Sequence, residues 1–133
     1  MHSASNSFSR EITRHFDSYF EEYNLATSYV ELILILCEQG ELSQNDLADQ
    51  MKLAPSTITR FVNKLVKKEL VQKNKVGRTA IITLSRNGRV LAPTLKSDFE
   101  RAVNDLEAIL GEKYVHTTKE LLLYGTNLLK QRE

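Results

Sequence analysis

Residues Leu42 to Ser85 have the sequence LSQNDLADQMKLAPSTITRFVNKLVKKELVQKNKVGRTAIITLS, a pattern that predicts a helix, a tight turn, a second helix and a β-hairpin. Most of the positive charge falls in the same part of the chain. Between Lys52 and Arg89 there are ten basic residues and one acidic residue, Glu69, so this segment carries +9. The whole chain carries +1, so the remaining residues sum to −8. A near-neutral chain with one strongly basic segment is suited to meet a polyanion on one face.

The two central helices of this stretch have clear boundary signals. Ser43 can cap the first helix, and Asp46 is favoured in its first turn by the helix dipole. Residues 52–54 form the predicted turn. Pro55 suits the first position of the second helix, because its missing N–H costs nothing there, and we expect this helix to end near Lys68.

This second helix has an apolar side and a polar side. The apolar side must pack inward and consists of Ile58, Phe61, Val62 and Leu65. The opposite side carries Ser56, Arg60, Asn63 and Lys67, with Thr59 and Lys64 flanking them. Short hydroxyls near a helix start, together with Arg and Asn, are what a major-groove helix needs to hydrogen-bond base edges. Contact of Arg60 and Asn63 with phosphate is an equally good interpretation.

The remaining segments predict more helices and one hairpin. Helices are expected at about 7–23, 28–39, from after Ser85 to Gly111, and 117–130, and strands at 71–75 and 79–84. Thr27 or Ser28 is expected to cap the helix at 28–39. Pro93 predicts a late start or a bend in the helix before Gly111.

Apolar stripes on the terminal helices indicate a helical bundle, formed between themselves and with a second copy. The first stripe is Phe8, Ile12, Phe16, Tyr19, Phe20 and Tyr23; the second runs from Leu91 to Leu110; and the third, expected to face inward, is Leu121, Leu122, Leu128 and Leu129. The predicted fold is mainly α with a small β-hairpin wing. A winged helix-turn-helix core at 28–86 is flanked by dimerisation helices at 1–27 and 87–133.

Residues 42–73, and residues 77–89 with the sequence GRTAIITLSRNGR, resemble the MarR family of winged helix-turn-helix transcriptional regulators. Residues 55–60 are close to the start of that family's recognition helix, and Arg78 falls where the family keeps a wing arginine. The resemblance implies a homodimer that binds a pseudopalindromic duplex, with one recognition helix and one wing per half-site. We expect a ligand-responsive repressor.

The chain departs from the family pattern in four ways. Lys52 and Glu69 stand at turn positions where the family usually has glycine, and Ala54 replaces the usual serine cap. Val76 replaces an acidic residue two positions before Arg78, and the hairpin is a few residues shorter.

These observations give two sets of candidate site residues. The DNA-binding set is Ser56, Thr57, Thr59, Arg60, Asn63, Lys64, Lys73, Lys75, Arg78 and Thr79. Aromatic effectors of the family often bind between the dimer helices and the core, and here the expected lining is Phe16, Tyr19, Tyr23 and Tyr29. Plain core packing is the favoured interpretation of these four aromatics.

Other functions have less support. Cys37 follows an apolar run and is interpreted as an inert core thiol, with an oxidant sensor as the alternative. The three histidines have no metal-ligand spacing, no cofactor is expected, and no nucleophile–base pair indicates an enzyme. The other alternative is a winged-helix interaction module with an acidic partner. The longest apolar run has six residues and residues 1–7 lack a signal-peptide core, so we expect a cytoplasmic protein.

Overall fold

The computed structural model of the chain describes residues 1–132 and has the expected fold class. It is mostly helical with one small antiparallel sheet. In chain order the elements are α1 (His2–Asp17), the 3-10 turn η1 (Glu21–Tyr23), α2 (Thr27–Gln39), β1 (Glu41–Ser43), α3 (Gln44–Met51), α4 (Pro55–Lys67), β2 (Val71–Val76), β3 (Thr79–Leu84), α5 (Arg86–Leu110) and α6 (Glu112–Gln131).

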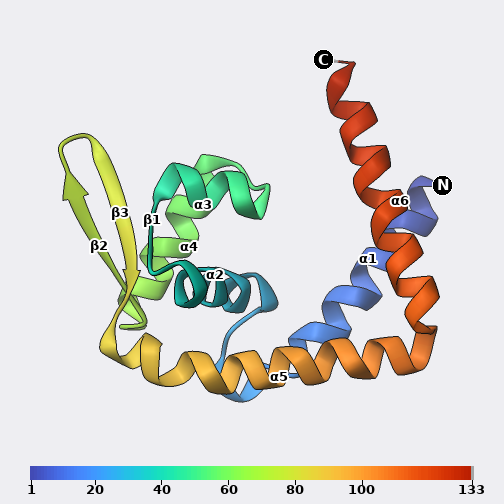
Figure 1. Cartoon of the computed structure of the whole chain (residues 1–133), viewed down its shortest axis with the longest axis horizontal. Helices are drawn as coiled ribbons and strands as arrows, with labels where there is room; N and C mark the ends of the chain where they lie inside the picture. The colour runs from blue at the N-terminus through green and yellow to red at the C-terminus, as the bar shows by residue number, and fades with distance from the viewer. Residues whose placement is uncertain (133) are drawn as a thin grey trace.

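Helix α5 is the frame on which the other elements are arranged (Figure 1). Its 25 residues span roughly 37 Å. The winged helix-turn-helix core lies over its first half, and α1 and α6 lie at its far end. The β2–β3 hairpin projects from the side of the core that faces away from α6.

The core is closed by apolar side chains from every helix of the helix-turn-helix and from the sheet. Ile33, Leu47, Ile58, Ile82 and Leu95 are all fully buried, and they come from α2, α3, α4, β3 and α5 respectively. The strand order is β1-β3-β2, so β3 is central and antiparallel to both neighbours. Burial of this cluster fixes α4 against α2 and α3 and leaves its other side exposed.

The junction between the wing and α5 depends on a close backbone approach. Ser85 caps α5: its Oγ accepts from the Gly88 N–H at 3.1 Å and donates to the Glu69 carbonyl at 2.6 Å. A Cβ placed on Gly88 would stand 2.1 Å from the Leu70 carbonyl oxygen, so only glycine fits. The sequence Leu84-Ser85-Arg86-Asn87-Gly88 therefore locks the wing to the start of α5.

Several predicted boundaries were wrong. Helix α1 begins at His2 and ends at Asp17, because small polar residues continue the helix without an apolar period and the chain then bends into η1. Helix α6 begins at Glu112, five residues earlier than expected. Helix α5 begins at Arg86 and continues past Pro93, so the late start, one of the two outcomes expected from Pro93, does not occur.

Strand β1 was missed because a three-residue strand has too few residues to show a period. It pairs Glu41–Ser43 with residues 81–83 of β3. The capping prediction for α2 was also wrong: neither Thr27 nor Ser28 is the cap residue, which is Ala26 without a side-chain hydrogen bond.

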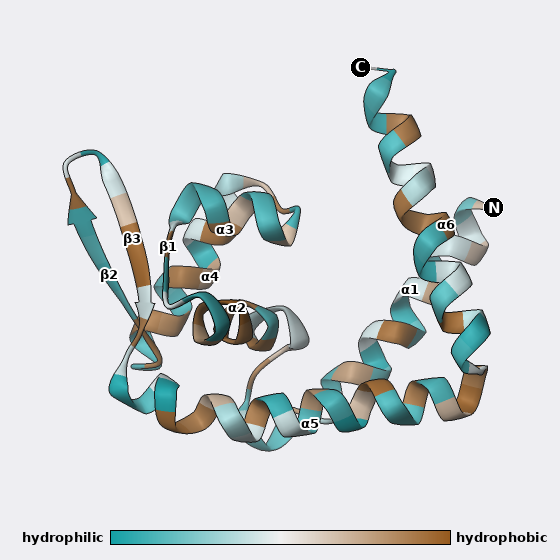
Figure 2. Cartoon of the chain, viewed as in Figure 1, coloured by the Kyte–Doolittle hydropathy of each residue, from teal (hydrophilic) through white to brown (hydrophobic). Residues whose placement is uncertain are grey.

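The four α6 leucines expected to face inward are exposed in the single chain. Leu121, Leu122, Leu128 and Leu129 expose 63, 55, 49 and 58% of their surface. Helix α6 meets the first half of α1, where the ring centres of Phe8 and Tyr114 lie 6.4 Å apart, and apolar residues recur along α6 (Figure 2). Burying this stripe therefore requires a surface outside the single chain.

Candidate nucleic-acid interface

Helix α4 presents a polar face to solvent. Ile58, Val62 and Leu65 are fully buried, whereas Ser56, Arg60 and Asn63 are exposed on the opposite side. The apolar stripe anchors the helix and so holds this polar side outward. Three of the residues predicted to read bases are therefore available to a partner.

Thr59 differs from these three residues because its hydroxyl already forms hydrogen bonds within the protein. Its Oγ1 donates to the Pro55 carbonyl at 3.0 Å and accepts from Gln44 Nε2 at 2.6 Å. The Gln44 Oε1 atom is buried and has no hydrogen-bond partner among the described residues. Thr59 thus ties α4 to the first turn of α3, a role that sequence spacing does not show.

Lys64 and Tyr29 were predicted for two different sites but lie together. The Lys64 Nζ atom is 5.1 Å from the centre of the Tyr29 ring, a cation–π distance. The Tyr29 ring centre is 4.6 Å from that of Phe61. This cluster joins α2 directly to α4.

The wing carries the remaining candidate residues. Its strands meet at a two-residue turn, Gly77-Arg78, in which Gly77 adopts a φ of 64° that favours glycine. Lys75, Arg78 and Thr79 are exposed near this turn, and Lys73 is half-buried at the position paired with Ile82. The hairpin therefore places two full positive charges at its tip.

The departures from the family pattern have local structural effects. Lys52 and Glu69 adopt left-handed φ values of 57° and 62°, as expected where glycine is usual. Each conformation costs a non-glycine residue about 1–2 kcal/mol. Ala54 starts α4 without a side-chain cap, so Pro55 at the first position and the contact of Thr59 with Gln44 are what hold this end of α4.

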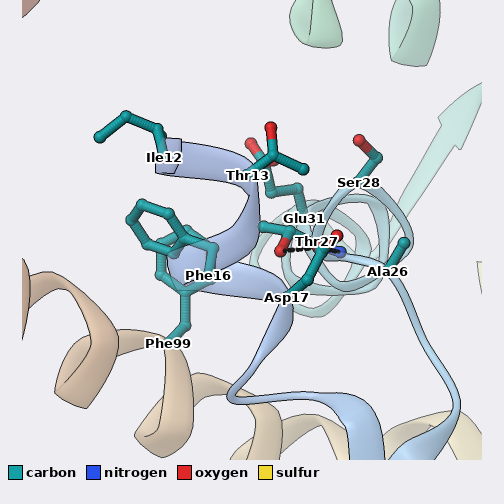
Figure 3. Close-up of a pocket in the computed structure, with 9 residues that line it drawn as sticks. All are labelled: Ile12, Thr13, Phe16, Asp17, Ala26, Thr27, Ser28, Glu31 and Phe99. Carbon is teal, nitrogen blue, oxygen red and sulfur yellow. Dashed lines mark hydrogen bonds between the residues drawn. The ribbon is translucent and has the colours of Figure 1, made fainter. Parts of the chain in front are cut away.

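A groove of about 290 Å³ lies between α1, the start of α2 and α5, and Figure 3 shows the residues around it. It is lined by Ile12, Thr13, Phe16, Asp17, Ala26, Thr27, Ser28, Glu31 and Phe99. Of the four aromatics expected to line an effector site, only Phe16 lines this groove. Asp17, Glu31 and Phe99 were not foreseen, because their convergence depends on how three helices pack.

The tyrosines at 19 and 23 have other partners. The Tyr23 hydroxyl donates to Asp98 at 2.8 Å, and this hydrogen bond raises the pKa of Tyr23 to about 12. The Tyr19 hydroxyl donates to Asp105 at 2.5 Å, which raises the pKa of Tyr19. Both bonds fasten the segment after α1 to α5.

Cys37 is exposed, so its interpretation as a core residue was wrong. It stands in the last turn of α2, which extends past the core and borders an open cavity with Gly40, Thr83 and Arg89.

His15 Nε2 is 2.8 Å from the Ala102 carbonyl oxygen. Within residues 1–132, no three His, Cys, Asp or Glu side chains lie close enough to hold a metal, and none of the helices described there could cross a membrane.

Comparison with known proteins agrees with this geometry. The sequence model of the MarR family matches residues 27–75, which include α2, the helix-turn-helix and most of β2. The HTH-type transcriptional regulator SarZ of Staphylococcus haemolyticus (strain JCSC1435) is 25% identical over 108 residues, covering 79% of this chain and 74% of that protein.

Solved structures show the same fold over nearly the whole chain. Ligand-free NadR superposes with a TM-score of 0.80 at 19% identity, covering 98% of this chain and 96% of NadR. The MepR–DNA complex of S. aureus also gives 0.80, at 21% identity, covering 98% and 97%. NadR in complex with 4-hydroxyphenylacetate gives 0.76 at 22% identity, with both chains fully covered. With its helix-turn-helix, its wing and its flanking helices in these positions, the chain has the fold of these structures, and its residues 27–75 match the MarR family of winged helix-turn-helix transcriptional regulators.

Proposed function

We propose that the chain binds a pseudopalindromic DNA site as a homodimer, represses transcription there, and is released by a small molecule. The observation that carries this proposal is the division of α4 into a fully buried apolar side and an exposed side with Ser56, Arg60 and Asn63. Arg and Asn are the side chains that pair with guanine and adenine edges in the major groove.

The charge distribution supports the same arrangement. The segment from Lys52 to Arg89, which carries +9, includes α4 and the whole wing. Ser56, Thr57, Arg60 and Asn63 would enter the major groove, while Lys73, Lys75, Arg78 and Thr79 would approach the backbone or minor groove. Contacts with phosphate would supply affinity, and the α4 contacts would supply preference for sequence.

The exposed apolar face of α6 supports a dimer. In addition to its four leucines, Tyr114 and Tyr124 expose 49 and 64% of their surface. A continuous apolar stripe of this kind marks an interaction surface, and a second copy of the same stripe is a self-complementary partner. Residues 1–27 and 87–133 would then form the dimer, and residues 28–86 would bind DNA.

The groove beside Phe16 is the proposed effector site. Its walls come from α1, α2 and α5, so a bound molecule contacts both the dimer helices and the core. Such a molecule would release DNA only if it bound more tightly to a spacing of the two recognition helices that does not fit the duplex.

Selection from a pool of random duplexes tests this function. We expect enrichment of one site with two inverted half-sites. A chain that binds all duplexes equally, or none, would contradict the proposal. If the chain binds no duplex but binds an acidic protein, this result would favour the interaction module instead.

A further inference from the structure

The groove between α1, α2 and α5 has an acidic lining. Of the nine residues around it, Asp17 and Glu31 are acidic, and none is Lys, Arg or His. Figure 3 shows both acidic side chains on the same side of the groove as Thr27, with the rings of Phe16 and Phe99 beside them. The charge that the lining offers to a ligand is therefore negative.

Asp17 occupies the one position in this groove that would otherwise attract an anion. The first N–H groups of a helix bind anions well, and α2 begins here. The Asp17 Oδ1 atom accepts from the Thr27 N–H at 2.8 Å and from the Thr27 hydroxyl at 2.6 Å. A ligand carboxylate would have to displace this contact and approach a second carboxylate.

Glu31 lies one turn further along α2 on the same side as Thr27. Although Glu31 is exposed as a residue, the protein around its carboxyl group removes enough water to raise the pKa of that group. A carboxylate that has lost part of its hydration gains from a nearby positive charge, because the screening by water is weaker there.

The aromatic side of the groove suits a ring. The ring centres of Phe16 and Phe99 lie 5.4 Å apart at an interplanar angle of 34°. Two such rings offer apolar surface to an aromatic ligand and their faces also attract a cation.

We propose that this groove selects an organic cation with an aromatic ring, with its ammonium group at Glu31 and its ring against Phe16 and Phe99. This inference rests on the proposed effector role of the groove and gives that effector a charge. The ligand in the NadR complex, 4-hydroxyphenylacetate, has a carboxylate and so the opposite charge.

Three probes with one ring and different charges test the proposal: tyramine as the cation, 4-ethylphenol as the neutral form and 4-hydroxyphenylacetate as the anion. Calorimetric titration of the full chain without DNA should show tyramine binding at least about tenfold more tightly than the anion, the size expected for one partly screened ion pair. Glu31→Gln should remove most of this difference, because only the carboxylate of Asp17 then remains in the lining. Phe16→Ala should weaken the binding of tyramine and 4-ethylphenol alike.

Glu38→Gln is the matched control, because it removes the same charge from an exposed position two turns along α2 that does not line the groove. It should leave the tyramine preference unchanged. The proposal is overturned if the anion binds as tightly as tyramine, if the preference survives Glu31→Gln undiminished, or if no probe binds at millimolar concentration. The duplex selection contains no probe and the calorimetric titration contains no DNA. A chain that does not bind DNA can therefore be distinguished from a groove that does not select a cation.

Discussion

The exposed leucine face of α6 allows dimer formation to be tested with a single substitution, Leu121→Ala. Leu121 exposes 63% of its surface in the single chain, the most of the four leucines. Alanine has a higher helix propensity than leucine, so the change keeps α6 helical. Any weakening of the dimer then results from the contact that Leu121 loses with the second copy.

The expected magnitude follows from the exposed fraction. Complete burial of a leucine side chain contributes about 1.5–3 kcal/mol, and covering the part exposed here contributes roughly 1–1.5 kcal/mol for the atoms that alanine lacks. In a symmetric dimer each residue occurs twice, so the dimer loses about 2–3 kcal/mol. This corresponds to a rise in the dimer dissociation constant of about 30- to 150-fold.

Sedimentation equilibrium over a range of concentrations measures that constant. The wild-type chain should be a dimer at micromolar concentration, and Leu121→Ala should raise the dimer dissociation constant by about 30- to 150-fold. Val76→Ala is the control, because Val76 is 66% exposed but lies in the wing. A wild-type chain that sediments as a 15.2 kDa species, or equal constants for wild type and Leu121→Ala, would refute the reasoning.

Four further substitutions test other parts of the molecule. Arg60→Ala should reduce the binding free energy on the selected site by ~1–3 kcal/mol and relax the preference for one base pair per half-site. Lys73→Ala should instead weaken binding to all duplexes equally, and competition binding at several salt concentrations would show this difference. Gly88→Ala should lower the free energy of unfolding by about 1–3 kcal/mol in thermal melts, because its Cβ would meet the Leu70 carbonyl; an unchanged melt would contradict this. Glu31→Gln should be more stable than wild type at neutral pH: the pKa of Glu31 is raised in the fold, so the wild type loses stability as pH rises through that pKa, and the difference should vanish below about pH 4.

The helix-turn-helix could be predicted from sequence because its signals are local. The Ser43 hydroxyl accepts from the Asp46 N–H at 3.0 Å, Pro55 starts α4, and Ile58, Val62 and Leu65 are all buried as their spacing indicates. Each of these features depends on residues within one or two turns. The wing followed in the same way from two short strands and Gly77.

The groove and the contacts around α4 could not be predicted because they join residues far apart in the chain. Phe16 and Phe99 come together only when α1 packs on α5. Thr59 has the type and spacing of a base-reading residue, yet its hydroxyl is bound by Gln44 from another helix. A pattern of residue types along one helix does not show which of them a neighbouring helix already occupies.

Helix α2 connects the groove to α4 through Tyr29 and Glu31, which are two positions apart in the sequence. Glu31 faces the groove, and Tyr29, about 200° around the helix, contacts Phe61 of α4. A ligand that pulls α2 toward α1 therefore acts on the Tyr29 ring and on the Lys64 ammonium above it. Because packed side chains shift between discrete arrangements rather than deform continuously, a small movement of α2 can change the position of α4. The residues proposed to bind an effector and those proposed to bind DNA are thus separated by the width of a single helix.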